Sequence, residues 1–140
     1  MDKNCSYKIN KKEKIIFISY KGDISINDII IILKKLTSEL DYSPYFDEVS
    51  DFRNCNLLVN INELPMFLDF VKNQVNMKGS RKNIYLTNMP NQVALTKLFS
   101  ISLKKSPVII HIVSTIKLTT DLLSRPNLDQ NKLKAILDNI

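Results

Sequence analysis

Residues 14–21 are apolar on both sides of an extended chain, and this feature constrains the fold more than any other. In a strand, alternate residues share a face. One face then carries Ile16, Ile18 and Tyr20, and the opposite face carries Ile15, Phe17 and Ser19. A strand that is apolar on both faces is typical of a sheet with helices on both sides. The segment therefore predicts an α/β fold.

Strand and helix patterns alternate along the rest of the chain. Strand patterns cover residues 7–10, 14–21, 46–52, 82–87 and 108–113, and helix patterns cover residues 26–40, 62–76, 90–104, 115–123 and 130–140. The order ββαβαβαβαα predicts one mixed sheet of four or five strands flanked by helices, with parallel later strands and an antiparallel opening hairpin. Since the 140 residues contain no repeat or linker, we expect residues 1–140 to form a single domain.

Capping residues predict where several helices begin. Ser25, followed by Asp28 three positions later, resembles a capping box. Asn60 or Asn62 is expected to cap the second helix, and Asp129 the last one. A polar loop at residues 54–56 is expected between the third strand and the second helix, because Asn favours turns.

The net charge of +6 raises the question of nucleic-acid binding, but the basic residues argue against it. Lysines are spread along the chain, and Arg53, Arg81 and Arg125 are the only arginines. Interfaces that read bases favour arginine for its planar, bidentate fork. We therefore expect no specific nucleic-acid binding, and only a weak, salt-sensitive affinity.

The chain has no apolar run of the roughly 18–20 residues that a membrane span needs. Residues 1–6 lack the apolar segment of a secretory signal. Cys5 and Cys55 fit no metal-ligand spacing and are expected to be free thiols. These features predict a cytoplasmic protein without a membrane span.

Catalytic signatures are missing from the sequence. With only Gly22 and Gly79, no glycine-rich phosphate loop can form. The single histidine, His111, lies inside a predicted strand, where a structural role is expected. A dyad of Cys55 with His111 would need a third, orienting group. We therefore expect neither an enzyme nor a bound cofactor or metal.

Asp51, Arg53, Asn54 and Asn56 form the first candidate site. They follow the third strand, and ligand sites of open α/β sheets lie beyond the carboxyl ends of strands. An arginine fork next to a helix N-terminus suits a carboxylate or a phosphate. The alternative is a surface ion pair between Asp51 and Arg53, with asparagines that only form turns.

The second candidate site is a second apolar side of the helix at residues 62–76. One stripe of that helix holds Ile61, Leu64, Phe67, Leu68, Val71 and Val75, whereas Met66, Phe70 and Met77 fall together on another side. A helix that is apolar on two sides is either sandwiched or in contact with a partner. Met66 and Phe70 therefore contact a protein partner or a second copy of the chain, or the C-terminal helix covers them.

Four patterns resemble one known group of proteins. They are Tyr-x-Ile followed by Ile-Ile-x-Ile-x-Tyr-x-Gly-Asp-Ile-Ser at residues 7–25, Val-x-Asp-Phe-Arg-Asn at 49–54, Ile-Tyr-Leu-Thr-Asn-x-Pro at 84–90, and Val-Ser-Thr with a later Leu-Leu at 113–123. Together they resemble the STAS-like, anti-sigma-factor-antagonist-like superfamily, which is related to CRAL-TRIO lipid-binding domains. The resemblance implies a four- or five-stranded mixed sheet and a non-enzymatic role.

The resemblance does not extend to the phosphorylation motif of that superfamily. Phosphorylated members carry Asp-Ser and a following Gly after the third strand, where this chain has residues 51–56 without Ser or Gly. No phosphorylation site is therefore assigned. The leading hypothesis, which follows from the resemblance, is a regulatory module that docks onto a protein in a bacterial cytoplasm. The alternative is a carrier of a small apolar or anionic ligand or a lipid. A large apolar cavity would favour the carrier, and an exposed Met and Phe surface the docking module.

Overall fold

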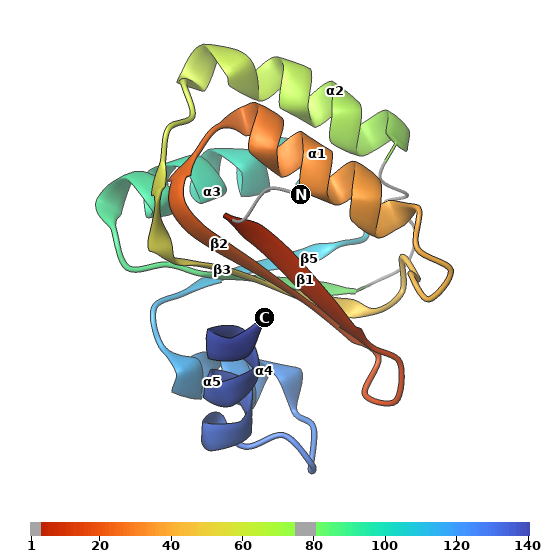
Figure 1. Ribbon diagram of the computed structural model, residues 1–140. Coiled ribbons are helices and arrows are strands. Elements are labelled where there is room, and N and C mark those ends of the chain that lie inside the picture. Colours follow the sequence, from red (N-terminus) through yellow and green to blue (C-terminus); the bar gives the residue numbers. More distant parts are fainter. Residues whose placement is uncertain (1–3, 75–80) are drawn as a thin grey trace.

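The computed structural model describes residues 4–74 and 81–140 (Figure 1). The strands are β1 (Cys5–Asn10), β2 (Ile15–Ile24), β3 (Asp47–Leu57), β4 (Lys82–Leu86) and β5 (Ile109–Val113). The helices are α1 (Ile26–Thr37), the short 3-10 helix η1 (Ile61–Glu63), α2 (Leu64–Gln74), α3 (Pro90–Ser102), α4 (Ile116–Leu123) and α5 (Gln130–Asn139). The predicted order of elements is confirmed, and the expected end of the second helix at residue 76 lies outside the described residues.

The five strands form one mixed sheet in the order β1-β2-β3-β4-β5. β1 pairs antiparallel with β2, whereas β2, β3, β4 and β5 run parallel to one another. The predicted α/β fold with an antiparallel edge hairpin is therefore confirmed.

Helices cover both faces of the sheet, as the two apolar sides of β2 predict (Figure 1). Each parallel strand is added at the same edge, so crossovers of one hand place α1, α2 and α3 on the same face. Only the chain after β5 can then cover the other face, and α4 and α5 pack there. Ile16 and Ile18 are fully buried under the first layer, and Ile15 and Phe17 under the second.

Local capping explains where the helices begin. Ser25 and Asp28 form a reciprocal capping box at the start of α1. Asn60, rather than Asn62, caps the turn η1 that leads into α2. Asp129 caps α5 through the backbone N–H of Lys132. Each cap satisfies backbone N–H groups that a helix start leaves without partners.

The expected loop at residues 54–56 is wrong, because this segment belongs to β3. β2 also continues, to Ile24, and pairs with it in parallel. The register moves from Ser19 opposite Asp51 to Lys21 opposite Asn54, which leaves one extra residue on β3. Such a bulge reverses the side on which the following residues point. Cys55 and Leu57 are consequently buried, and Asn54 and Asn56 are exposed.

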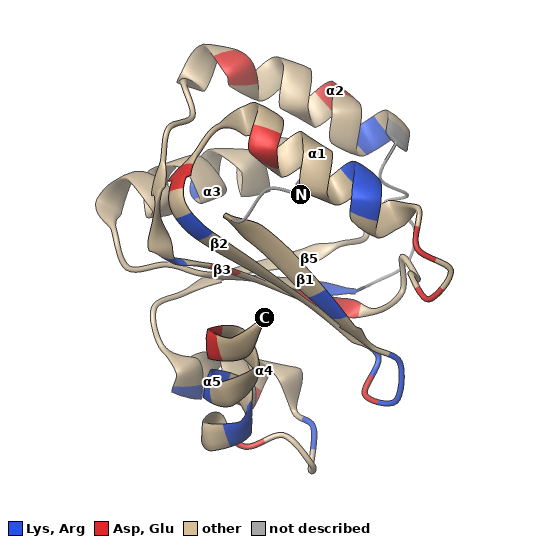
Figure 2. Cartoon of the chain, in the orientation of Figure 1, with Lys and Arg blue, Asp and Glu red and all other residues tan. Residues whose placement is uncertain are grey.

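No helix among the described residues is long and apolar enough to cross a membrane. Figure 2 shows both acidic and basic residues on α1, on α2 and in the β1–β2 turn. This mixture of signs agrees with the expectation that the positive net charge is not concentrated in one binding surface.

Candidate functional site

All three arginines of the chain pair with carboxylates on β3. The pairs are Arg125 with Asp47 at 2.9 Å, Arg81 with Glu48 at 3.4 Å, and Arg53 with Asp51 at 3.0 Å. Successive residues of a strand point to opposite faces, so these pairs lie on both sides of the sheet. They differ in how many guanidinium N–H groups find a partner, and this difference identifies the candidate site.

The Asp51–Arg53 ion pair is bidentate, with two guanidinium N–H groups bound to the two carboxylate oxygens. Arg53 Nε and Nη2 each donate to one carboxylate oxygen of Asp51 at 3.0 Å, and the Arg53 backbone N–H donates to the same group at 3.1 Å. The Asp51 side chain is only 2% exposed. The hydrogen bond to Asp51 raises the pKa of Arg53. The prediction that Asp51, Arg53, Asn54 and Asn56 lie beyond the end of the strand is wrong, since β3 continues to Leu57.

The surroundings of this pair favour a structural role. Asp51 points to the face of the sheet that α4 and α5 cover, as does Val49 two residues earlier. Asn56 donates to Asp23 of the neighbouring strand at 3.3 Å. Arg53 therefore compensates a buried carboxylate, whereas the sequence pattern suggested an open fork for an anionic ligand.

Replacing Arg53 tests this interpretation. Arg53→Ala is expected to lower the free energy of unfolding by about 1–3 kcal/mol, because Asp51 then loses its charged partner in a buried position. Urea denaturation of the variant and of Lys21→Ala, on the neighbouring strand, measures the difference. An unchanged unfolding midpoint for Arg53→Ala would contradict the structural role. It would then favour the interpretation that Arg53 binds a ligand.

Arg125 is also fully engaged. Its Nε donates to the Glu13 carbonyl at 3.0 Å, its Nη1 to the Leu123 carbonyl, and its Nη2 to Asp47 at 2.9 Å. These contacts join the segment after α4 to the β1–β2 turn and to the start of β3. Arg125 therefore connects three parts of the chain, and each of its three side-chain nitrogens has a partner.

Arg81 differs because two of its nitrogen groups lack a partner. The ion pair with Glu48 involves Nη2, whereas Nε and Nη1 are buried without a hydrogen-bond partner among the described residues. The side chains of Arg81 and Glu48 are only 2% and 7% exposed. The Asn83 Oδ1 atom and the Tyr42 hydroxyl, which lies beside Arg81, are also buried without a partner in the described part of the chain.

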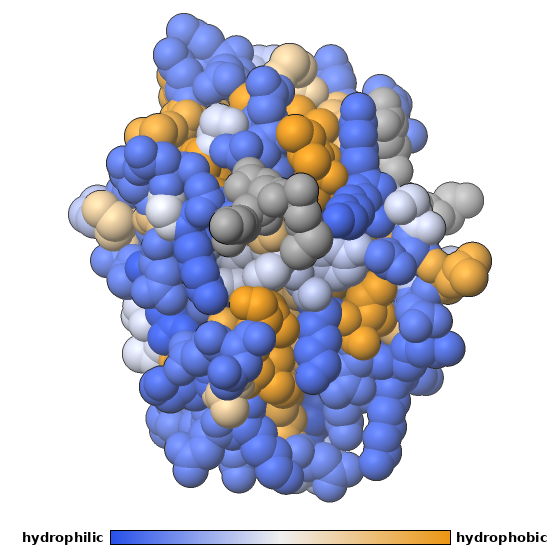
Figure 3. All heavy atoms as spheres, viewed as in Figure 1, coloured by the Kyte–Doolittle hydropathy of each residue, from blue (hydrophilic) through white to orange (hydrophobic). Residues whose placement is uncertain are grey.

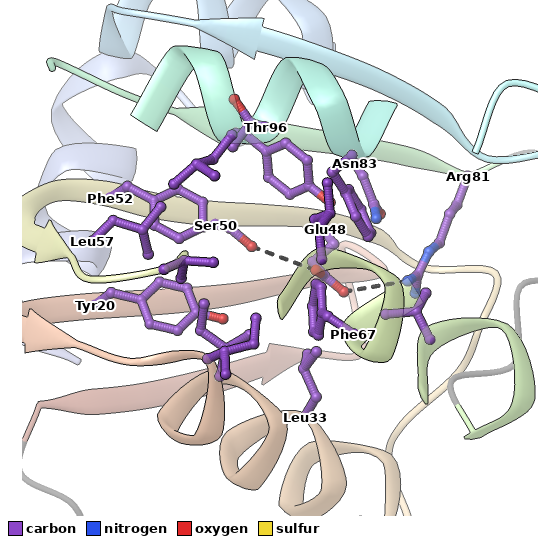
Figure 4. A pocket seen from close by; sticks show the side chains of 18 residues that line it. Tyr20, Leu33, Glu48, Ser50, Phe52, Leu57, Phe67, Arg81, Asn83 and Thr96 are labelled. Atoms are coloured by element: carbon purple, nitrogen blue, oxygen red, sulfur yellow. Dashed lines mark hydrogen bonds and ion pairs between the residues drawn. The ribbon is translucent and has the colours of Figure 1, made fainter. Parts of the chain in front are cut away.

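Glu48, Arg81 and Asn83 line one end of a cavity of about 90 Å³ between the sheet and helices α1, α2 and α3, whereas Tyr42 is not among its lining residues. The rest of the wall is apolar, and it includes Leu33 from α1, Phe67 from α2 and Phe99 from α3. Figure 4 shows Ser50, Glu48 and Arg81 as a connected row at this cavity. The Ser50 hydroxyl donates to Glu48 at 3.4 Å. The arrangement can hold a small molecule with one polar end.

The strand register places these residues together. Glu48 is the direct neighbour of Asn83 across β3 and β4, and Ser50 is the neighbour of Tyr85. Alternate residues of each strand point to the α1–α3 face, so the polar groups at 48, 50 and 83 share it. Arg81 precedes Asn83 by two residues and reaches the same face.

Burial and charge determine the protonation states around the cavity. Burial opposes the charge on Arg81, but Glu48 and Tyr42 outweigh this effect, so the pKa of Arg81 lies above its ordinary value. Burial, followed by the charge of Glu48, raises the pKa values of Tyr20 and Tyr85 well above their usual range. The cavity therefore contains neutral phenols beside the Arg81–Glu48 ion pair.

Met66 and Phe70 do not share an exposed surface. Met66 is 51% exposed, whereas Phe70 is 9% exposed and points from α2 into the core on the α1–α3 side of the sheet. The Phe70 ring lies 6.3 Å from that of Phe67, and the Lys34 ammonium lies 5.8 Å from its centroid. The prediction that Phe70 lies on an exposed face is therefore wrong. The alternative that the C-terminal helix covers Phe70 is also wrong, because α1 packs over it. Met77 lies outside the described residues.

Exposed apolar side chains on the visible face form separate patches between hydrophilic residues (Figure 3). Three apolar residues between the end of β3 and the first turn of α2 are each more than half exposed, namely Leu58, Ile61 and Met66. Of the predicted Met and Phe surface, Met66 is therefore the member that the described residues show to be exposed.

Cys55 and His111 lie on opposite faces of the sheet. Cys55 belongs to the core on the α1–α3 side, and His111 is the neighbour of Ile84, which points to the α4–α5 side. Cys5 and Cys55 are buried free thiols, as expected. Burial raises the pKa of Cys55 to about 11, which keeps it in the unreactive thiol form. No group of three potential metal ligands occurs within residues 4–74 and 81–140.

Sequence reasoning missed Gln92, which is fully buried at the start of α3. Its amide nitrogen donates to the carbonyls of Phe52 and Cys55 at 2.7 and 3.0 Å, where the bulge disturbs the β-ladder. Its amide oxygen accepts from the backbone N–H groups of Asn88 and Met89. Gln92 thus stabilises the bulge and joins α3 to β3.

Glu48, Arg81 and Asn83 were also missed as site residues. The available signal was the alternation of Glu48 and Ser50 on one face of a strand that is otherwise buried. Arg81 and Asn83 show no comparable pattern, since their position next to Glu48 depends on the pairing of β3 with β4.

No protein-family model and no curated protein matches the chain. Among solved structures, an uncharacterized protein from the DUF3478 family with a SpoIIAA-like fold, from Shewanella loihica PV-4, is similar in structure. It shares 10% sequence identity at a TM-score of 0.51, over 88% of this chain and 98% of that protein. This likeness shows the fold alone and does not show the relation to CRAL-TRIO domains. The chain therefore has a SpoIIAA-like, STAS-like fold built on a five-stranded mixed sheet.

Proposed function

We propose that this chain is a non-enzymatic binding domain that holds a small, largely apolar molecule in the cavity between the sheet and α1–α3. The observation that carries the proposal is the buried Arg81 guanidinium, which has two N–H groups without a partner among the described residues, beside an otherwise apolar cavity. A buried donor without a partner costs about 1–3 kcal/mol. A ligand that accepts these hydrogen bonds removes that cost.

The cavity volume limits the size of the ligand. A volume of about 90 Å³ accommodates a small ring or a short branched chain. Water molecules also fit in a cavity of this size. A larger ligand requires α1 and α2 to move away from the sheet. The proposal therefore concerns a small molecule, or the polar end of a longer one.

Benzene is a suitable probe of the cavity, and a cavity-filling variant makes its binding specific. We expect benzene to shift the backbone amide resonances of the residues that line the cavity. Val71→Phe fills part of the space, because Val71 is a buried lining residue, and it should abolish these shifts. Val93→Phe makes the same change at an exposed position of α3 and should retain them.

Absence of benzene-dependent shifts in the unmodified chain would contradict the proposal. Equal shifts in the Val71→Phe variant would also contradict it, since they would place benzene elsewhere. Overpacking is expected to cost about 1–3 kcal/mol, so a thermal melt of each variant is needed to confirm that it folds. Mass spectrometry of molecules extracted from both variants identifies a ligand retained during purification.

A regulatory docking role is the second candidate, and the exposed group of Leu58, Ile61 and Met66 at the start of α2 favours it. Met side chains adapt to varied protein surfaces. If this role is correct, Met66→Lys weakens self-association or partner binding while the fold remains intact.

A further inference from the structure

We propose that the polar end of the cavity selects a neutral ligand that carries a carbonyl oxygen next to an N–H or O–H group, such as a primary amide, and that Glu48 discriminates against carboxylates. This inference rests on the proposed function, because it names the chemistry of the ligand in the same cavity.

The hydrogen-bonding groups left without partners define the ligand. Arg81 Nε and Nη1 can only donate, and the Tyr42 hydroxyl beside Arg81 forms no hydrogen bond of ordinary geometry with them, so a ligand can present the acceptor that they lack. Asn83 Oδ1 can only accept, so a ligand must present a donor to it. Arg81 and Asn83 are two residues apart at the start of β4 and both line the cavity (Figure 4). An amide group combines both functions on neighbouring atoms.

The charge balance of the site selects against an anion. Glu48 and Arg81 are the only charged side chains that line the cavity within the described ranges, and their charges cancel. A carboxylate ligand would add an uncompensated negative charge to a buried site that already holds the Glu48 carboxylate. Burial of an unpaired charge is far more costly than burial of a neutral hydrogen-bonded amide. An amide keeps the contacts to Arg81 without that charge.

Isobutyramide and isobutyrate test the inference, because they have nearly the same shape and differ in charge. Both are titrated into the full chain near neutral pH, with backbone amide shifts of the cavity residues as the readout. We expect isobutyramide to bind at least about tenfold more tightly, which corresponds to about 1.4 kcal/mol. Equal affinity, or tighter binding of isobutyrate, would overturn the inference.

Glu48→Gln should reverse the preference. The variant removes the competing negative charge and leaves Arg81 with an uncompensated positive charge, so isobutyrate affinity should rise about tenfold or more. Glu39→Gln is the control, since Glu39 is exposed at the end of α1 and does not line the cavity. An unchanged isobutyrate affinity in Glu48→Gln would contradict the role of Glu48.

Asn83→Leu provides an independent arm if Glu48→Gln does not fold. It removes the acceptor and keeps a similar volume, so it should weaken isobutyramide binding about tenfold relative to benzene binding. Benzene binding without any response to isobutyramide would overturn the polar selectivity but not the proposed function. No response to either probe would overturn both.

Discussion

Arg81→Met is expected to lower the free energy of unfolding by about 3–5 kcal/mol, because it leaves the buried Glu48 carboxylate without its cation. The Arg81 and Glu48 side chains lie 3.4 Å apart at Nη2 and Oε2, and almost no solvent reaches either of them. Met approximates the length and the apolar stem of arginine, so the loss of charge dominates the loss of packing. Urea denaturation followed by circular dichroism measures the change.

The double variant Glu48→Gln with Arg81→Met separates the charge from the packing. Removing both charges should recover most of the lost stability, since neither charge then remains buried without compensation. The coupling energy comes from the cycle of two single variants and the double variant. A single Arg81→Met variant that unfolds within about 1 kcal/mol of the unmodified chain would show that the Glu48 charge is compensated elsewhere.

Phe70→Lys is expected to destabilise the fold by about 3–5 kcal/mol, whereas Met66→Lys should stay within about 0.5 kcal/mol. Phe70 packs against Phe67 in the core, and the Lys34 ammonium already lies over its ring. A second ammonium at position 70 would be buried and would repel Lys34. Met66 faces solvent, where a lysine is readily hydrated.

Thermal and urea unfolding of both single variants, with Phe70→Leu as the conservative control, test this contrast. Phe70→Leu keeps an apolar side chain and should retain more of the stability than Phe70→Lys. A mild effect of Phe70→Lys would restore the interpretation that Met66 and Phe70 form one exposed contact surface. The sedimentation behaviour of Met66→Lys then shows separately whether this residue takes part in association.

The arginines illustrate how far residue type alone can be interpreted. The three arginines stand out among many lysines, and each of them pairs with a carboxylate of β3. At Arg53 the sequence allowed two interpretations, an external anion or a pair with Asp51, and Asp51 accepts the hydrogen bonds of Nε and Nη2. The guanidinium with unpaired N–H groups is instead that of Arg81, whose Nε and Nη1 have no hydrogen-bond partner among the described residues. The partner of an arginine depends on strand pairing, which the spacing of residues along the chain does not reveal.

The sequence by itself determined the elements, their order and most of their boundaries. The two apolar faces of residues 14–21 predicted a central strand, and Ser25 and Asp129 predicted two helix starts. These features depend on contacts within a few residues, on side-chain periodicity and on the satisfaction of nearby backbone N–H groups. Such contacts are visible in a linear pattern.

Only the tertiary structure decided which residues form the candidate site. The bulge in β3 buries Cys55 and Leu57 and exposes Asn54 and Asn56, and Gln92, some 37 residues further along, supports it. The cavity combines side chains from β2, β3, β4 and three helices, so it exists only after the sheet is assembled. Burial and charge pairing at such a site are properties of distant segments packed together, and no local pattern encodes them.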